Sequence, residues 1–279
     1  MGMVPVAAHN HIGCHHEATA DERARAEGVI THDSPREASA PCDMVIMFVP
    51  GSAEAQNVVL GDDGMGAGLR PGGIIANMST GDFGVNMRLA EFVKGKGVIR
   101  MDTPVLGGPE SVGHWAFAVG GNKDDFECSM PVLEVLDGAR DRVFHVGQLS
   151  NGNKLKLLNN MMLGAINACA AETMALVACM GISRKTLTDV AVAAEGRILS
   201  DVYLEIGNRI AESRADKPTL SLKMLAKENR LYLNMAREYK APLVLGTAVD
   251  HINRMSVAQG LGNEDHTCVW KSIQRNWKK

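Results

Sequence analysis

Two patterns of apolar residues divide this sequence near residue 150, and they constrain the fold more than any single motif does. Before that point, short apolar runs alternate with segments of helical spacing. The runs DMVIMFVP at 43–50 and GGIIANMST at 72–80 are almost unbroken, which is typical of parallel strands covered on both faces. Strands that alternate with helices in this way predict a doubly wound α/β sheet.

The strand pattern extends only through the first half of the chain. Further strands are expected at 97–108, 115–121 and 142–147, with helices between them. Two domains are therefore expected, an α/β domain at 1–150 and an all-helical domain at 151–279. In the second half, helical spacing predicts helices at 153–180, 183–194, 196–213, 221–239, 242–259 and 264–276.

Composition excludes several classes of function. Lysine and arginine number 29 against 32 aspartate and glutamate, and aromatic residues make up only 4%, so neither a polyanion-binding surface nor a base-stacking platform is expected. The N-terminus lacks a secretory signal, and the longest apolar stretch, 155–182, is interrupted by Lys156, Asn160 and Glu172. We therefore expect a soluble, cytoplasmic protein that contacts neither nucleic acid nor membrane.

Cysteine and histidine usage suggests no disulfide framework and no metal centre. The six cysteines form no CxxC pair, and several lie inside apolar patterns, so reduced, buried thiols in a cytosol-like compartment are expected. Four early histidines, His9, His11, His15 and His16, have spacings that could suit a metal ion. No carboxylate or thiol is fixed beside them, so no metal is expected.

Candidate ligand-binding residues follow the ends of three predicted strands. In open parallel sheets, ligands bind beyond the carboxyl ends of the strands, and here those ends are the segments 49–52, 79–81 and 104–108. All three consist of small or turn-forming residues, which let backbone N–H groups approach a ligand closely. The alternative is that Ser52 and Thr80 only cap helices and the glycines only turn the chain.

Lys156 and Asn160 form a second candidate site, because they stand one turn apart near the start of a long apolar helix. A buried lysine must form an ion pair, react, or extend its amine to solvent. Partial burial would lower the lysine pKa from about 10.4 towards neutrality, where the amine can exchange a proton with a substrate. The alternative places Lys156 in an exposed first turn of the helix.

Six motifs occur in one order from about residue 28 to the end of the chain: MFVP, GLRPGGIIANMST, MDTPVLGG, GNKLKLLNN, KMLAKENRLYLNMAREYKAPLVL and GLGNEDHT. In these motifs the chain resembles the β-hydroxyacid dehydrogenases of the 3-hydroxyisobutyrate dehydrogenase type. The resemblance implies a Rossmann domain that binds NAD or NADP, followed by an all-helical domain with a long interdomain helix. It further implies an oxidoreductase that interconverts a small β-hydroxyacid and its semialdehyde by hydride transfer.

The resemblance also assigns roles to residues that match its motifs. Lys156 is similar to the family's general acid/base, which takes the hydroxyl proton while a hydride leaves the alcohol carbon. Asn160 is similar to the amide that orients the substrate. Gly107 and Gly108 match the positions whose backbone N–H groups bind the substrate carboxylate.

Four further residues match cofactor-binding positions of the family. Val49, Pro50 and Thr80 match residues that line the nicotinamide cofactor, and Lys227, in AKENRL, resembles a second-domain lysine that reaches the cofactor. From its spacing alone, Lys227 would be a solvated charge on a helix.

The choice between NAD and NADP depends on a short charged segment. Asp21 or Glu22 is expected near the ribose hydroxyls, which favours NAD, whereas Arg23 and Arg25 could bind a 2′-phosphate and so favour NADP. NAD is the expected cofactor, with NADP as the alternative.

The chain departs from the family pattern at three places. A first strand and the G-x-G-x-x-G turn that cradles the pyrophosphate do not precede GMVPVAAH. That strand is central in doubly wound sheets, so its loss should expose strand edges and weaken dinucleotide binding. Leu106 replaces the serine usual before the two glycines, and Glu228 replaces the frequent aspartate after the second-domain lysine.

Two alternatives to the dehydrogenase follow from these departures. One is another reductase of the superfamily, of tartronate semialdehyde or imine reductase type; the presence of Lys156 argues against the imine reductases. The other is a truncated, non-catalytic relative that serves as a binding or oligomerisation module. In either case the apolar long helix favours a homo-oligomer, a dimer or a tetramer.

Overall fold

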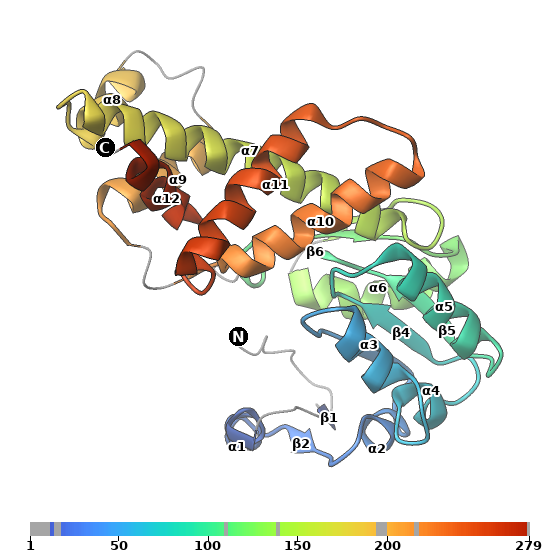
Figure 1. Ribbon diagram of the computed structural model, residues 1–279. Helices are drawn as coiled ribbons and strands as arrows, with labels where there is room; N and C mark the ends of the chain where they lie inside the picture. Colours follow the sequence, from blue (N-terminus) through green and yellow to red (C-terminus); the bar gives the residue numbers. More distant parts are fainter. Residues whose placement is uncertain are drawn as a thin grey trace. The chain divides into compact units, whose positions relative to one another are not determined.

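The computed structural model describes residues 12–13, 18–108, 111–137, 140–193, 200–214 and 218–277. The chain forms two compact units, which divide between Lys156 and Leu157. We refer to these as the first and the second unit. The first unit is built of strands and helices and the second of helices (Figure 1), so the predicted fold class is confirmed.

The central sheet of the first unit consists of three parallel strands. β3 (Met44–Met47), β4 (Ile74–Asn77) and β5 (Ile99–Asp102) lie in that order, and all three fall within the predicted apolar runs. The three strands run in the same direction, with Ile75 of β4 opposite Val45 and Arg100. Their carboxyl ends therefore lie along one edge of the sheet.

The strand predicted at 97–108 is two strands in the structure, and the single-strand prediction was wrong. β5 ends at Asp102, and β6 (Val105–Leu106) follows after Thr103 and Pro104. Proline has no N–H to donate to a strand ladder, so the chain turns away from the first sheet here.

A second small sheet continues from the first. β7 (Ala116–Val119) pairs antiparallel with β6 and parallel with β8 (Val143–His145). A bridge between Asp102 and Gly120 links the end of β5 to the residue after β7. Asp102 is therefore the residue at which the two sheets meet.

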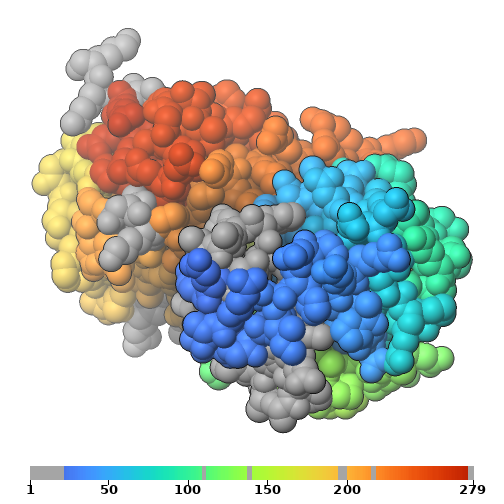
Figure 2. All heavy atoms as spheres, turned by 90° about the horizontal axis from the view of Figure 1, so that it is seen from below, coloured from blue at the N-terminus to red at the C-terminus, as the bar shows by residue number. Residues whose placement is uncertain are grey.

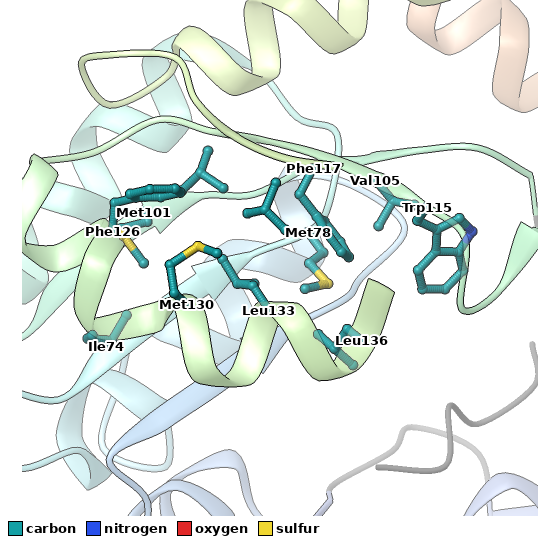
Figure 3. Close-up of a cluster of buried hydrophobic side chains, with 12 residues drawn as sticks. Ile74, Met78, Met101, Val105, Trp115, Phe117, Phe126, Met130, Leu133 and Leu136 are labelled. Carbon is teal, nitrogen blue, oxygen red and sulfur yellow. The ribbon is translucent and has the colours of Figure 1, made fainter. Parts of the chain in front are cut away.

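Helices cover both faces of the first sheet. Ile74 and Ile75 are adjacent in β4 and so point to opposite faces, each into its own apolar cluster. On the Ile74 face, Met130 and Leu133 of α6 point towards the strands (Figure 3). On the other face the cluster includes residues of α3 and α5. The helices of this sheet are α3 (Ser52–Val59), α4 (Met65–Gly68), α5 (Phe83–Lys94) and α6 (Lys123–Asp137), with a 3₁₀ turn η2 at Arg140–Arg142.

The first two strands form a separate parallel pair. β1 (Ile12–Gly13) pairs with β2 (Ile30–Thr31), and neither pairs with β3. Within the described residues β3 is thus an edge strand, and Ile46 and Phe48 are 38% and 45% exposed. The helices here are α1 (Ala18–Ala26) and α2 (Pro35–Ser39), and the blue surface of α2 adjoins the light blue surface of α3 and α4 in Figure 2.

The second unit is built around α7, whose small side chains let other helices approach. Ala170, Ala171 and Ala175 are fully buried in its core. At Gly164 an added Cβ would lie 3.1 Å from a methyl group of Val249 on α11. Its helices are α7 (Asn151–Cys179), α8 (Arg184–Ala193), α9 (Asp201–Ala211), α10 (Leu222–Glu238), α11 (Val244–Ser256) and α12 (Val269–Trp277), with a π turn η3 at Val257–Leu261 and a 3₁₀ turn η4 at His266–Cys268.

By length and composition, α7 could cross a membrane, contrary to the expectation that no segment would qualify. The core helix of a globular protein passes the same test. Within the most apolar part of α7, 44% of the residues are buried inside the protein. The buried Asn167 side chain donates a 3.0 Å hydrogen bond to the His266 carbonyl oxygen. We therefore interpret α7 as the core helix of the second unit.

The five cysteines in the described part of the chain are free thiols. The expectation that they would be buried was largely wrong. Cys268 is buried and Cys42 half-buried, but Cys128, Cys169 and Cys179 are exposed. Helical positions facing away from the core account for the last three, because an apolar sequence context does not decide which face of a helix a residue occupies.

Candidate active site

Two loops at the carboxyl edge of the first sheet are tied together by serine hydroxyls. Ser79 accepts a 2.7 Å hydrogen bond from the Val49 backbone N–H, and Ser52 accepts one of 2.8 Å from the Asp82 backbone N–H. The alternative reading of Ser52 as a helix cap is therefore wrong, because its hydroxyl bonds to the neighbouring loop. Asp82 instead caps α5, through a 3.0 Å bond from the Val85 N–H.

The residues predicted to bind the cofactor from the first unit all lie on these two loops. Val49 and Thr80 are half-buried and Pro50 is exposed. Because both loops are fixed, these three residues present an ordered edge at the ends of β3 and β4. They lie at the edge where open parallel sheets bind ligands.

A buried chain of polar groups supports the same edge. Asn77, at the end of β4, accepts from the Ser79 N–H at 3.1 Å and donates to the Asn86 side chain at 3.3 Å. Arg100 donates to the same Asn86 oxygen at 3.0 Å. Burial lowers the pKa of Arg100 to about 10, and the nearby Asp102 opposes this shift. Sequence reasoning missed these groups, although polar residues at the ends of otherwise apolar strands are a usable signal.

Gly107 and Gly108, the predicted carboxylate-binding residues, lie directly after β6. Gly107 is exposed with a φ of +135°, and an added Cβ would lie 2.8 Å from the Trp115 ring. The Trp115 indole donates a 2.8 Å hydrogen bond to the Gly108 carbonyl oxygen. Figure 3 shows Trp115 beside Val105, at one end of the core cluster. The loop thus needs glycine for its conformation and is held in place by a packed tryptophan.

Lys156 lies in the second turn of α7 and is half-buried. The alternative of an exposed first turn is therefore wrong. The start of α7 is fixed by Asp102, whose carboxylate accepts from the backbone N–H groups of Ser150 and Asn153 at 2.5 and 2.7 Å. This contact could not be predicted from the sequence, because Asp102 is distant from Ser150 and Asn153 along the chain.

Asn160 follows Lys156 by one turn on α7 and belongs to the second unit. Its side chain is 3% exposed and donates a 2.6 Å hydrogen bond to the carboxylate of Glu228, which is 6% exposed. Lys227 precedes Glu228 on α10 and is half-buried. The expectation from spacing alone, that Lys227 is a solvated charge, is thus only partly met. Glu228 holds Asn160 in one orientation, a role that the sequence did not reveal.

The charged residues considered for the ribose site lie on α1. Asp21, Glu22, Arg23 and Arg25 all fall within this helix, and the last three are exposed. Arg25 donates a 2.5 Å hydrogen bond to the hydroxyl of Thr31.

The four early histidines, at which no metal was expected, lie outside the described residues. Within the described part of the chain, histidine, cysteine, aspartate and glutamate form no group of three that could hold a metal ion.

Each half of the chain matches a domain of a known dehydrogenase. Residues 6–147 match the NAD-binding domain of 6-phosphogluconate dehydrogenase, and residues 150–273 match the NAD-binding domain of NADP-dependent 3-hydroxyisobutyrate dehydrogenase. The first match alone covers half of the chain. It begins close to Met1, so it includes the segment that the six motifs left out.

Relatives of known name agree with these matches. A probable mitochondrial 3-hydroxyisobutyrate dehydrogenase of Dictyostelium discoideum is 27% identical over 92% of this chain and 81% of its own length. A chloroplastic glyoxylate/succinic semialdehyde reductase of Arabidopsis thaliana is 26% identical over 86% of this chain and 66% of its own. A solved 3-hydroxyisobutyrate dehydrogenase of Mycobacterium tuberculosis, with L-serine, has a TM-score of 0.83 at 25% identity and covers 96% of this chain and 92% of its own.

The matches to both halves of the chain lead to one assignment. The names of these relatives describe oxidoreductases, and both matched domains bind NAD. The chain belongs to the β-hydroxyacid dehydrogenase family, with its NAD-binding domain and its C-terminal helical domain.

Proposed function

We propose that this protein interconverts a small β-hydroxyacid, similar to 3-hydroxyisobutyrate, and its semialdehyde, with NAD as the cofactor. The observation that carries the proposal is the placement of Lys156 and Asn160 one turn apart on α7, with Asn160 held by Glu228. A proton-transfer amine beside a fixed amide is suited to a substrate that carries a hydroxyl or carbonyl oxygen.

Each predicted residue has a part in this reaction. Lys156 takes the hydroxyl proton during oxidation and returns it during reduction, and Asn160 orients the same oxygen. The backbone N–H groups of Gly107 and Gly108 bind the carboxylate; the support for this role is that Gly107 is exposed and adopts a φ of +135°, which suits glycine. When bound, the nicotinamide supplies the site that accepts or donates the hydride.

Four residues would hold the cofactor. Val49, Pro50 and Thr80 would contact its nicotinamide end from the edge of the first sheet, where their loops are tied together. Lys227 would contact it from α10. Arg25, one of two candidate 2′-phosphate ligands, is already bonded to Thr31, which supports NAD over NADP. The KM for each cofactor measures this preference.

The experiment that tests the proposal is a turnover assay of the purified chain. NAD and NADP are each offered with 3-hydroxyisobutyrate or 2-(hydroxymethyl)glutarate, and their reduced forms with glyoxylate or succinic semialdehyde. Substitution Lys156→Ala should lower kcat by about 10²- to 10⁴-fold, the usual contribution of a positioned acid/base. Lys154→Ala is the matched control, because it removes a lysine of the same helix whose amine lies over Phe83.

Three outcomes would contradict the proposal. Full activity in Lys156→Ala would show that Lys156 is not the acid/base, although the protein would still be an oxidoreductase. Turnover of glyoxylate or an imine but not of the hydroxyacids would favour another reductase of the superfamily. Absence of any cofactor binding would favour the non-catalytic binding module, for which the open edge of β3 is the supporting observation.

We also propose that the chain forms a homo-oligomer through α7. From Leu158 onward, positions 158, 162, 165, 169, 172, 176 and 179 follow one another by steps of three and four, as in the seam of a coiled coil. Six of the seven are exposed, and Glu172 is the one charged residue among them. Leu158, Met162 and Leu176 are 44%, 58% and 52% exposed. Such a stripe on an otherwise buried helix is suited to pairing with a second copy.

The oligomer is tested by light scattering during gel filtration. Met162→Glu combined with Leu176→Glu should lower the measured mass to that of one chain, because two charges would be placed on the seam. Val190→Glu adds a charge at an exposed apolar position of α8, off the seam, and should leave the mass unchanged. A wild-type mass of one chain would refute the oligomer.

The cytoplasmic location stays a prediction, which cell fractionation can check.

A further inference from the structure

The carboxylate of Asp102 is buried at the point where three elements meet. Asp102 is the last residue of β5 and is 2% exposed. Its two oxygens accept hydrogen bonds from the backbone N–H groups of Ser150, at 2.5 Å, and Asn153, at 2.7 Å. These are the residue before α7 and the third residue within it. A side chain from a distant strand thus satisfies the first turn of the helix that carries Lys156.

The surrounding backbone leaves room for this carboxylate and for little else. At Gly120, an added Cβ would lie 2.4 Å from an Asp102 oxygen. At Gly152, in the first turn of α7, it would lie 2.1 Å from the Ala118 carbonyl oxygen and 2.9 Å from Asp102. Ser150 adopts a φ of +76°, which non-glycine residues rarely do. The contact is therefore surrounded by positions of restricted backbone geometry, Gly120, Ser150 and Gly152.

We propose that Asp102 is the positioning residue that fixes Lys156 relative to the loop of Gly107 and Gly108. Its side chain holds the first turn of α7, and its backbone begins the short segment that leads to Gly107 and Gly108. Lys156 lies three residues after Asn153, about 4.5 Å along the helix axis. Both ends of this connection belong to the first unit. The inference rests on the proposed role of Lys156 as the acid/base.

Protonation of this carboxylate should weaken the connection, because a protonated oxygen is a poorer acceptor for an N–H group. Burial raises the pKa of Asp102 to about 6, against the lowering effects of the Asn153 and Ser150 N–H groups and of Arg100. Arg100 lies two residues earlier on β5 and is bonded to Asn86. The charged residues in the first two turns of α7 are Lys154 and Lys156. On β8, the imidazole of His145 bonds to the Gly121 carbonyl oxygen at 2.8 Å.

Amide hydrogen exchange tests the structural part of the proposal without substrate. In the wild-type chain, exchange at residues 150–156, corrected for the intrinsic effect of pH, should speed up as the pH falls from about 8 to about 5. The first turn of α9, capped by the non-titratable hydroxyl of Ser200, is the internal control and should not respond. Asp102→Asn should show the fast exchange at every pH. Equal protection of 150–156 in Asp102→Asn and wild type would overturn the proposal.

Kinetics in the reductive direction test the link to Lys156. With succinic semialdehyde or glyoxylate and reduced cofactor, Lys156 works in its protonated form, so a fall of kcat below about pH 6 cannot come from the lysine. Asp102→Asn should lower kcat by about ten- to a hundredfold with little change in KM, since misplacement of a catalytic group by about 1 Å costs that much. The variant should also lose the decline near pH 6.

Two further variants keep the test decisive. Gly152→Ala displaces the helix start while keeping the carboxylate, so it should reproduce the loss of kcat and the fast exchange. Ser200→Ala removes a helix cap elsewhere in the chain and should leave kcat unchanged. A normal kcat in a folded Gly152→Ala or Asp102→Asn would overturn the proposal. If the wild type turns over none of the probes, the proposed function fails, whereas the exchange data still decide whether Asp102 fixes this turn.

Discussion

The amide nitrogen of Asn160 donates a 2.6 Å hydrogen bond to the carboxylate of Glu228, and both side chains are almost completely buried. Asn160 lies on α7 and Glu228 on α10, so the bond connects the two helices on which the second unit places its predicted site residues. Asn159 donates to the Asn160 oxygen at 3.4 Å. The Glu228 carboxyl group accepts from the amide nitrogen, so it fixes which end of the Asn160 amide faces α10.

Loss of Glu228 should therefore reduce substrate binding more than the acid/base step. Glu228→Ala leaves the Asn160 N–H groups buried without that acceptor, which costs about 1–3 kcal/mol of stability. We expect its KM for 3-hydroxyisobutyrate to rise at least about tenfold. Glu228→Gln keeps an acceptor oxygen and should show a smaller rise. Steady-state kinetics and thermal melts measure both effects, and an unchanged KM in Glu228→Ala would contradict the role.

The predicted carboxylate-binding role of the loop at Gly107 and Gly108 can be tested with a matched glycine control. Gly107→Ala places a Cβ 2.8 Å from Trp115, whereas Gly113 has a positive φ of +83° with open space around its Cβ position. Both variants strain the backbone, but only the first displaces the loop. Gly107→Ala should therefore raise the KM for the carboxylate-bearing substrate about tenfold or more, and Gly113→Ala should not. Similar kinetics in the two variants would argue against carboxylate binding at this loop.

The serine that joins β4 to the loop after β3 should affect cofactor binding. Ser79→Ala removes the 2.7 Å bond from the Val49 N–H, so the loop that carries Val49 and Pro50 loses its tie. We expect the KM for the cofactor to rise several-fold while the KM for the hydroxyacid changes less. Ser129→Ala removes an equally buried hydroxyl, bonded within α6 at 2.7 Å, and reports the cost of losing a buried hydroxyl elsewhere. Equal effects of the two substitutions would refute the cofactor role.

The sequence predicted the elements and the location of the candidate site better than the contacts that hold the site together. Apolar runs and helical spacing are local signals, so β3, β4 and α7 could be placed from neighbouring residues alone. The break after β5 was missed because the run at 97–108 remains apolar through Pro104. The rule that ligands bind at the carboxyl ends of parallel strands was enough to select the loops at Val49 and Thr80.

The supporting residues could not be predicted, because their partners are distant in sequence. Asp102 accepts from Ser150 and Asn153, and Glu228 from Asn160. Each is an acidic residue in a segment whose local pattern predicts only a strand or a helix. Burial gives such a carboxylate its role, and burial follows from tertiary packing rather than from local spacing.

His266 should make the second unit less stable as the pH falls. It is 6% exposed, and burial lowers its pKa below the ordinary value, with Asp265 opposing the shift. The unfolded chain therefore binds a proton at a higher pH than the folded one, so stability is lost as the pH falls below about 6.5, by at most about 1.4 kcal/mol per pH unit. The pKa of Asp265 is lowered from 3.8, so its own contribution is lost only at more acidic pH.

Thermal melts between about pH 8 and pH 5 test this contribution. His266→Asn should reduce the fall in Tm over this range, because the group that titrates is gone. His251→Asn removes an exposed histidine of α11 in the same unit and should leave the slope unchanged. If the slope in His266→Asn equals that of the wild type, His266 is not the source of the acid sensitivity.

The open edge of β3 predicts weak dinucleotide binding by this chain. β3 pairs with β4 on one side only within the described residues, and Ile46 and Phe48 are exposed beside it. The sequence also contains no G-x-G-x-x-G turn to cradle a pyrophosphate. We expect fluorescence titration with reduced NAD to give a Kd at least about tenfold weaker than that of a relative with this turn. Tight binding by this chain would contradict the prediction.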